Sequence, residues 1–362
     1  MNSTNPMLSS GLNPDPTDLL GNGTINFSLL KKLVGKSITA VHQFDKELVC
    51  ELCKFAALLE CRKIRTYDIL KGQIVITAFF EPSTRTRLSF ESAVLRLDGR
   101  VISIPEGARN TGVAKGESLS DIGEMFNAYG DAVVIRHTET EALAEISKNL
   151  RVPLINAGNG SGEHPTQALA DWFAILKWKP QMQSAQLPEE EQIHLGILGS
   201  PGSMRTVNSF LRMSLLFKQN IRKITVVSEL ANPLGEELSD LLEQSGIVFE
   251  ITDNINNVLS DLDVVYMNSI AFLGDSYRSL DSSFKLNTES ELKKDAVVLH
   301  PLARLDELDS TLDETDHNLY FTQAHGAVFV RQALFIAILD CFDRIPYQDR
   351  KETKIEYELQ TI

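Results

Sequence analysis

The stretch FFEPSTRTRLSFE, residues 79–91, marks the point where an apolar strand gives way to a helix. The strand is expected to end at Phe80 and the helix to begin near Thr84, so that the hydroxyls of Ser83 and Thr84 can cap the helix. The start of a helix exposes N–H groups and a partial positive charge, which favour a bound anion. Arg85 adds a planar guanidinium that suits phosphate oxygens. The stretch therefore predicts a phosphate site; the alternative is an ordinary helix cap with two surface arginines.

Apolar, strand-like runs alternate with helical patterns on both sides of this stretch. Such alternation is typical of α/β proteins with mostly parallel sheets. The length of 362 residues suggests two domains, and a long predicted helix at 167–179 separates two series of strands. The expected strands are Ile74–Phe80, Arg100–Ile104, Ala132–Ile135, Leu154–Asn156, His194–Gly199, Lys223–Val227, Val264–Tyr266 and Val297–Leu299.

The composition limits the classes of partner. Lys and Arg number 35 against 49 Asp and Glu, a net charge of −14, so we expect no attraction for nucleic acid or an anionic membrane surface. No run approaches the ~18 apolar residues of a membrane span, and the N-terminus lacks the pattern of a signal peptide, which favours a cytoplasmic protein. Cys50 and Cys53 lie on the apolar face of a predicted helix, which predicts buried thiols. We expect neither a metal nor a cofactor, because no zinc-like spacing is present.

Several further segments follow the 79–91 stretch in a fixed order, and together they resemble one family. They are Lys115–Leu119 (KGESL), Ile135–His137 (IRH), Asn156–Gln167 (NAGNGSGEHPTQ), Met204–Thr206 (MRT), His300–Leu302 (HPL) and Ala327–Ala333, which opens a final helix. With Ser83–Arg87, they make the chain similar to the aspartate/ornithine carbamoyltransferase family over roughly residues 35–342, and most of all to its aspartate branch.

The resemblance implies two doubly wound parallel-sheet domains with the active site between them. Residues 35–166 would bind carbamoyl phosphate, residues 181–325 would bind the amino acid, and the C-terminal helix at 326–344 would pack back on the first domain. Residues 1–25 are expected to form a disordered tail and residues 345–362 a polar one. The resemblance also implies a homotrimer with shared active sites, and leaves a higher assembly open.

The resemblance assigns roles to single residues as well. Hydroxyls and a guanidinium would hold the phosphate, and Arg85, Thr86, Arg136 and His164 would be catalytic, the last three by contacting the carbamoyl oxygen. Thr111 and Lys115 would reach into the active site of a neighbouring subunit. The whole carbamoyl phosphate site would comprise Ser83, Thr84, Arg85, Thr86, Thr111, Lys115, Arg136, His164, Gln167, Pro301 and Leu302.

The acceptor site departs from the family pattern. The aspartate branch normally continues after the late strand with Thr-Arg-Val-Gln, whose Arg and Gln hold the side-chain carboxylate of aspartate. In this chain Ser269 stands at the position of that Arg, and Ala271 stands at the position of that Gln. Either Arg278 folds back and supplies the missing guanidinium, or the acceptor is a different amine. The acceptor residues that we expect are Lys115, Arg136, Arg205, Arg278 and Leu302.

A second departure is the Leu302–Ala303 bond, where the family usually has Leu-Pro with a cis peptide. A cis bond before a residue other than proline is disfavoured. Two alternatives stay open: either this bond is cis, or the loop relaxes to the trans form.

The activity that we expect is transfer of a carbamoyl group from carbamoyl phosphate to L-aspartate, a step of de novo pyrimidine biosynthesis. One alternative is a carbamoyltransferase with another amine acceptor. The other is a non-catalytic, carbamoyltransferase-like subunit, but the presence of Arg85, Arg136, His164 and Gln167 together favours an enzyme.

Overall fold

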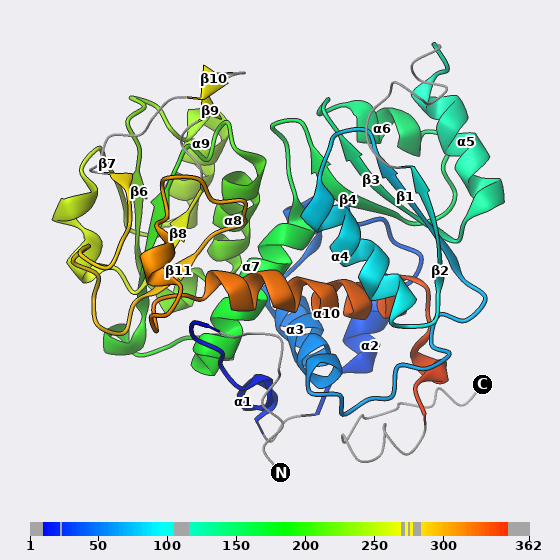
Figure 1. The fold of residues 1–362 in the computed structure, drawn as a ribbon, viewed down its shortest axis with the longest axis horizontal. Coiled ribbons are helices and arrows are strands. Elements are labelled where there is room, and N and C mark those ends of the chain that lie inside the picture. The colour runs from blue at the N-terminus through cyan, green and yellow to red at the C-terminus, as the bar shows by residue number, and fades with distance from the viewer. Residues whose placement is uncertain are drawn as a thin grey trace. The chain divides into compact units, whose positions relative to one another are not determined.

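The computed structural model describes residues 10–21, 24–104, 116–268, 272–273, 276–277 and 284–346. The chain divides into two compact units, which we call the first unit (residues 15–169 and 326–362) and the second unit (residues 1–14 and 170–325). Each unit is built on its own parallel sheet (Figure 1). The predicted α/β class with two parallel sheets is thereby confirmed.

The sheet of the first unit has four strands in the order β2-β1-β3-β4, all parallel. The strands span Ile74–Phe79 (β1), Arg100–Ile104 (β2), Ala132–His137 (β3) and Leu154–Asn159 (β4). One face packs against α5 (Leu119–Tyr129) and α6 (Ala142–Ser147). The core on this face contains Ile76, Ala78, Phe80, Ile122, Phe126, Val133, Ile135, Leu143, Ile146 and Leu154.

The C-terminal helix belongs in large part to the first unit, as predicted. In this helix, α10 (Tyr320–Ile338), Phe335 meets Phe90 of α4 (Thr84–Leu95) edge to face at 6.0 Å. The guanidinium of Arg331 lies 4.3 Å from the centre of the same Phe90 ring. Aromatic edge contacts of this kind add specificity to apolar packing. The predicted packing of the C-terminal helix on the first domain is confirmed.

Part of the segment that we expected to be disordered is folded. Within residues 1–25, α1 (Pro16–Leu20) begins after Asp15, whose carboxylate accepts from the N–H of Thr17 at 2.8 Å. Leu19 is 1% exposed, and α1 packs on α3 (Lys46–Glu60). The Asn- and Ser-rich composition did not predict this helix, which the Asp15 cap and the burial of Leu19 against α3 stabilise. Residues 347–362 of the predicted polar tail lie outside the described residues.

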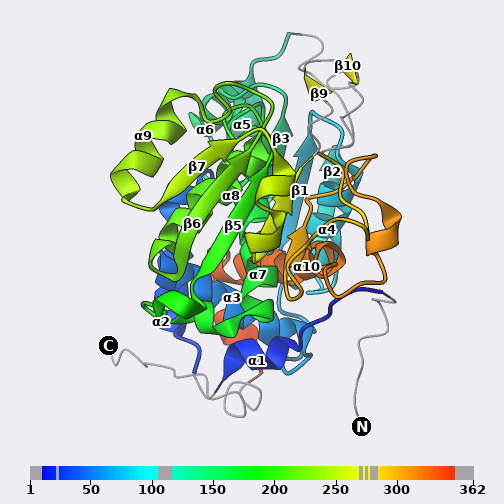
Figure 2. The ribbon, with the colours of Figure 1, turned by 90° about the vertical axis from the view of Figure 1, so that its left-hand side faces the viewer.

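The sheet of the second unit has five parallel strands in the order β11-β8-β5-β6-β7. Figure 2 shows β5, β6 and β7 side by side. The edge strand β7 was not predicted, whereas the other four strands lie where the sequence places them. The bounds are Ile193–Leu198 (β5), Ile221–Val227 (β6), Phe249–Thr252 (β7), Val264–Met267 (β8), Val297–Leu299 (β11), and for the helices Pro165–Trp178 (α7), Arg205–Leu216 (α8) and Gly235–Ser245 (α9).

Short elements complete the chain. The helix α2 (Phe27–Leu30) lies against α3, where the ring of Phe27 meets the ring of Phe55 at 5.3 Å. A small antiparallel pair joins β9 (Phe272–Leu273) and β10 (Ser276–Tyr277).

Cys50, Cys53 and Cys341 are buried free thiols, and Cys61 is partly exposed. The pKa of the Cys50 thiol rises to about 12, mainly through burial. Burial disfavours the thiolate, so Cys50 is an inert core residue, in agreement with the sequence.

Candidate active site

The predicted phosphate segment lies at the carboxyl end of β1, where α4 begins. Ser83 occupies the N-cap position of α4, but its hydroxyl makes no capping hydrogen bond. This corrects the expectation that the hydroxyl caps the helix. A hydroxyl that does not cap remains available to an anion, next to the N–H groups of the first turn. Thr84 and Arg85 are exposed on this turn, and Thr86 is half-buried.

Arg136 comes to the same edge of the sheet from the neighbouring strand. It pairs in register with Phe79 at the end of β1. Its Nη2 donates to Glu81 Oε1 at 2.7 Å, and its Nη1 donates to the carbonyl of Ala157 at 3.3 Å. These two contacts fix the plane of the guanidinium, which gives Glu81 a positioning role that the sequence did not suggest.

A buried amide shapes the loop between β4 and α7. Asn156 is 1% exposed, and its Nδ2 donates to the carbonyls of Thr39 and Glu163 at 2.9 and 3.1 Å. Its Oδ1 accepts from the N–H of Gly158 at 2.8 Å. Because these bonds tie both ends of the loop to one side chain, Asn156 sets the position from which His164 begins α7.

His164 and Gln167 lie at the start of α7 in the first unit. His164 is 2% exposed, and its Nδ1 lies 3.4 Å from the hydroxyl of Thr166. Gln167 is half-buried, and its N–H donates to the carbonyl of His164 at 3.0 Å. Together with Arg136 and the start of α4, they are the predicted site residues that the first unit contributes from the carboxyl ends of β1, β3 and β4.

In the second unit, the predicted acceptor residue Arg205 is the first residue of α8, which follows β5. The next residue, Thr206, accepts at its Oγ1 from Asn268 Nδ2 at 2.7 Å. Asn268 follows β8, which pairs with β5 through Leu198 and Met267. Arg205 and Asn268 therefore lie at the carboxyl ends of adjacent parallel strands, where open α/β sheets bind ligands.

The loop after β11 carries Pro301 and Leu302. The Leu302–Ala303 peptide is cis, which decides between the two alternatives that the sequence left open. Leu302 itself has φ +55°. Arg304 in this loop forms a two-point ion pair with Asp313 of the same unit, with 2.7 Å between Nη2 and Oδ2.

Other predicted site residues lie outside the described part of the chain. They are Thr111 and Lys115, the two departures at Ser269 and Ala271, and Arg278. Their roles therefore stay predictions.

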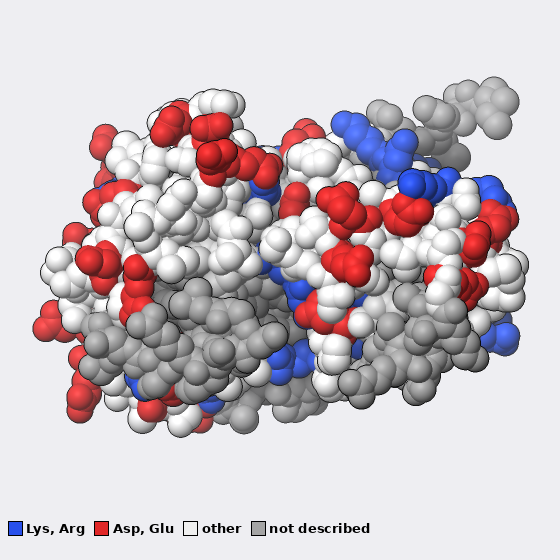
Figure 3. All heavy atoms as spheres, turned by 90° about the horizontal axis from the view of Figure 1, so that it is seen from above, with Lys and Arg blue, Asp and Glu red and all other residues white. Residues whose placement is uncertain are grey.

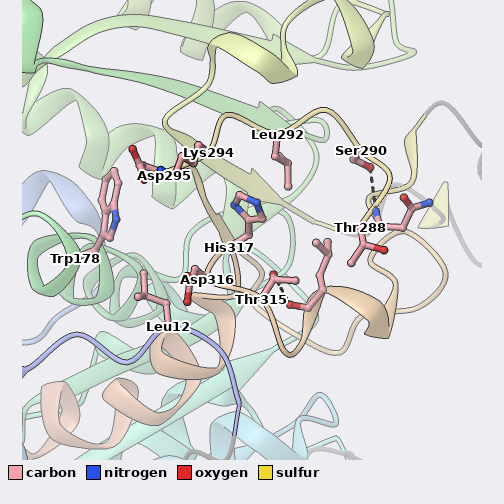
Figure 4. Close-up of a pocket in the computed structure, with 12 residues that line it drawn as sticks. Leu12, Trp178, Thr288, Ser290, Leu292, Lys294, Asp295, Thr315, Asp316 and His317 are labelled. Carbon is pink, nitrogen blue, oxygen red and sulfur yellow. Dashed lines mark hydrogen bonds between the residues drawn. The ribbon is translucent and has the colours of Figure 1, made fainter.

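The described residues hold a separate cavity of about 540 Å³ in the second unit (Figure 4). Leu12, Trp178, Leu292, Leu312 and His317 are among its lining residues, and none of the predicted site residues is. Within the described ranges, no group of three or more His, Cys, Asp or Glu side chains is placed to hold a metal ion. No helix in those ranges has both the length and the apolar character that crossing a membrane needs.

Among the charged side chains on the surface seen from above, Asp and Glu are the more widespread (Figure 3). Asp and Glu are spread widely over this face, and Lys and Arg form smaller groups. This distribution agrees with the net charge of −14. An anionic ligand would therefore need local positive charge, because the protein as a whole does not attract it.

Two parallel sheets, with arginines and a helix start at the carboxyl ends of their strands, define an α/β protein built to bind anionic ligands. Residues 36–177 match the family described as "Aspartate/ornithine carbamoyltransferase, carbamoyl-P binding domain", and residues 191–338 match its "Asp/Orn binding domain". The chain belongs to the aspartate/ornithine carbamoyltransferase family.

Relatives with known names support the aspartate branch. The aspartate carbamoyltransferase catalytic subunit of Pyrobaculum islandicum is 37% identical over 311 residues, which cover 84% of this chain and 98% of that protein. The chloroplastic aspartate carbamoyltransferase of Arabidopsis thaliana is 34% identical over 321 residues, 86% of this chain and 79% of that protein. The Trypanosoma cruzi aspartate transcarbamoylase solved with N-(phosphonacetyl)-L-aspartic acid has a TM-score of 0.72 and 29% identity, covering 86% of this chain and 97% of that one.

Proposed function

We infer that the chain is an aspartate carbamoyltransferase, which transfers the carbamoyl group of carbamoyl phosphate to L-aspartate and yields N-carbamoyl-L-aspartate and phosphate in pyrimidine biosynthesis. The observation that carries the inference is the helix start at Ser83–Thr86 beside Arg136, in a chain that matches both domains of the family. Purified protein is expected to release phosphate from carbamoyl phosphate only when aspartate is present. Phosphate release that does not depend on aspartate, or no release at all, would contradict the inference.

The first step of the reaction is attack of the aspartate amine on the carbonyl carbon of carbamoyl phosphate. A new C–N bond forms, and negative charge develops on the carbonyl oxygen. We assign the stabilisation of this charge to Thr86, Arg136 and His164, as in an oxyanion hole. Glu81 and the Ala157 carbonyl support this role, because they hold the guanidinium of Arg136 in one plane.

In the second step the C–O bond to phosphate breaks. The departing phosphate takes the proton from the amine, so that protons and charge balance without another acid or base. We assign the binding of the phosphate to Ser83, Thr84, Arg85 and Thr86. Thr111 and Lys115 of a neighbouring subunit would contribute to it. Gln167 and the main-chain carbonyls of Pro301 and Leu302 would hold the carbamoyl NH2 group.

The proposed catalytic unit is a homotrimer with shared active sites. Support comes from apolar side chains that are exposed on the first unit: Leu88 and Leu95 on α4, and Ile102 on the edge strand β2, are 53%, 57% and 44% exposed. The two leucines are seven residues apart and so lie on one face of α4, and α4 packs against β2. Exposed apolar groups of this kind are typical of surfaces that another protein covers. A cytoplasmic location is part of the proposal.

The amine that accepts the carbamoyl group has two candidates, L-aspartate and a different amine. Arg205 would bind the α-carboxylate of aspartate, and Arg136, Lys115 and Leu302 would lie nearby. Because Ser269 and Ala271 bear no charge, the distal carboxylate needs Arg278 or another cation. Transfer to a different amine is the second candidate, and a panel of amine acceptors compared by kcat/KM separates the two.

A further inference from the structure

Four buried polar residues are linked by hydrogen bonds beneath the loop that follows β11, partly through the backbone of His300. They are Asp171 of α7, Gln323 of α10, His300 and Glu307, and each is at most 1% exposed. All four belong to the second unit. Buried polar groups destabilise a fold unless they are hydrogen-bonded. The hydrogen bonds of these four residues therefore show which parts of the loop they hold in place.

The orientation of the Gln323 amide follows from its neighbours. The N–H of His300 lies 2.9 Å from Gln323 Oε1, and a backbone N–H can only donate. The oxygen of the amide therefore faces His300, and Nε2 donates to Asp171 Oδ1 at 2.5 Å. Gln323 thus links the end of β11 to the middle of α7.

The tautomer of His300 follows in the same way. The N–H of Leu302 donates to His300 Nδ1 at 2.9 Å, so Nδ1 is an acceptor and the proton is on Nε2. Nε2 then donates to Glu307 Oε1 at 2.9 Å. The other oxygen of Glu307, Oε2, accepts from the N–H of Leu305 at 3.0 Å. His300 and Glu307 hold both ends of the loop from within.

The loop that these groups hold carries residues assigned to the substrates. It begins at the carboxyl end of β11, which pairs with β8 and so lies beside Asn268. Leu302 has φ +55°, a left-handed conformation that residues with a Cβ rarely adopt. Such a conformation persists where surrounding contacts over-determine it, and the Leu302 N–H bond to His300 is one of those contacts.

We propose that Gln323, acting through His300, is a positioning residue that aims the Pro301 and Leu302 carbonyls at the NH2 group of the carbamoyl unit that is transferred. Gln323 is 1% exposed, so its role would be indirect. The proposal rests on the proposed function, because it needs those carbonyls in the transfer step. A misplacement of a supporting group by about 1 Å is enough to lower turnover strongly.

Gln323→Leu and Gln323→Glu each break this series of hydrogen bonds. Adding Asp171→Asn repairs the series in the Gln323→Glu variant but not in the Gln323→Leu variant. Gln323→Leu removes the side-chain acceptor of the His300 N–H and one donor to the Asp171 carboxyl. Gln323→Glu places two buried carboxyl groups side by side, and they repel each other when both are ionised. In the pair Asp171→Asn with Gln323→Glu, the new amide donates to the new carboxylate, which also accepts from the His300 N–H. The pair Asp171→Asn with Gln323→Leu restores nothing and is the matched control.

The experiment compares these four variants with the wild-type chain at pH 8. Steady-state kinetics give kcat and KM for aspartate, and calorimetry gives the Kd of inorganic phosphate. Gln323→Glu and Gln323→Leu are expected to lower kcat/KM for aspartate at least tenfold while the phosphate Kd changes less than twofold. Asp171→Asn with Gln323→Glu is expected to return kcat/KM to within threefold of wild type, and the matched control is not.

The outcomes separate the two proposals. Single variants with wild-type kcat/KM, or equal losses for aspartate and phosphate, overturn the positioning role, as does a folded double variant that recovers no activity. A wild-type chain that binds phosphate but transfers nothing to aspartate overturns the proposed function instead. Thermal unfolding of every variant shows whether a loss reflects the loop or the whole fold.

Discussion

Arg85 and Arg87 lie two positions apart on α4 and have different surroundings. The Nη1 of Arg87 lies 3.6 Å from Glu91 Oε1 and 3.5 Å from the Ser103 hydroxyl, so it is tied to its own helix and to β2. Arg85 is exposed on the first turn beside Ser83. This difference agrees with the predicted role of Arg85 as a phosphate ligand and places Arg87 in a structural ion pair with Glu91.

We predict that Arg85→Ala lowers kcat by about 10²–10³, the typical loss when one donor to a charged transition state is removed. Arg87→Ala is the matched control. It is expected to keep kcat within a few-fold and to lower the free energy of unfolding by about 1 kcal/mol, because the contacts of Arg87 with Glu91 and Ser103 are long, at 3.6 and 3.5 Å. Steady-state kinetics with circular dichroism on both variants check the prediction. Equal losses in the two variants would contradict it.

A second prediction at this scale concerns the acceptor. If Arg278 replaces the missing guanidinium, Arg278→Ala removes a charge-assisted hydrogen bond of roughly 1.5–3 kcal/mol and raises the KM for aspartate about tenfold to a hundredfold. The KM for carbamoyl phosphate is expected to stay unchanged. An unchanged KM for aspartate rules out this role for Arg278 and favours another acceptor or another cation.

At the scale of elements, the ion pair between Arg304 and Asp313 joins two parts of the segment between β11 and α10. Asp313 accepts from Arg304 and, at 2.5 Å, from the hydroxyl of Tyr320. The hydrogen bonds from Arg304 and then from Tyr320 hold the pKa of Asp313 below its ordinary 3.8. A carboxyl with a depressed pKa stabilises the fold fully above its unfolded-state pKa, and this stabilisation is lost as the pH falls through the folded-state value.

We therefore predict that Asp313→Asn lowers the free energy of unfolding at pH 7 by about 1–3 kcal/mol. The difference from wild type is expected to shrink towards zero as the pH falls below 3.8. Denaturant unfolding at a series of pH values measures it. Glu314→Gln, an exposed position on the same segment, is the control; a difference that persists at low pH would show that the ion pair is not its source.

The sequence predicts the elements well where apolar runs are long and buried. The strand β5 is buried throughout and was found, whereas β7 is a four-residue edge strand with half-exposed positions and was missed. Side-chain pairs distant in sequence were missed for another reason. Gln323 and Asp171 are separated by 152 residues, and no local pattern reports a contact that only the folded chain creates.

At the scale of the whole molecule, the exposed apolar side chains concern the assembly of subunits. The Thr111 and Lys115 roles need a neighbouring subunit, and the apolar side chains on α4 and β2 offer it a surface. A surface that is covered in the assembly tolerates no charge at its centre, because burying an unpaired carboxylate is strongly unfavourable.

We predict that Leu95→Glu dissociates the proposed homotrimer and lowers turnover at least tenfold, because each site would then lack the neighbour's loop. Sedimentation velocity and kinetics on one sample check both effects. Tyr67→Glu is the control, since Tyr67 is 75% exposed and lies outside α4 and β2. A Leu95→Glu variant that keeps the oligomeric state of the wild type would place the interface elsewhere.

The amino-terminal segment limits how far the chain can be shortened without loss of its folded core. The match to the family begins at residue 36, yet the core begins earlier: Leu19, Phe27 and Leu30 are almost fully buried. A chain trimmed to the family boundary keeps every proposed site residue but exposes the apolar face of α3 that α1 and α2 cover. The start of the family match and the start of the folded core are thus different. A protein shortened to the family match is expected to aggregate, even though it keeps every proposed site residue.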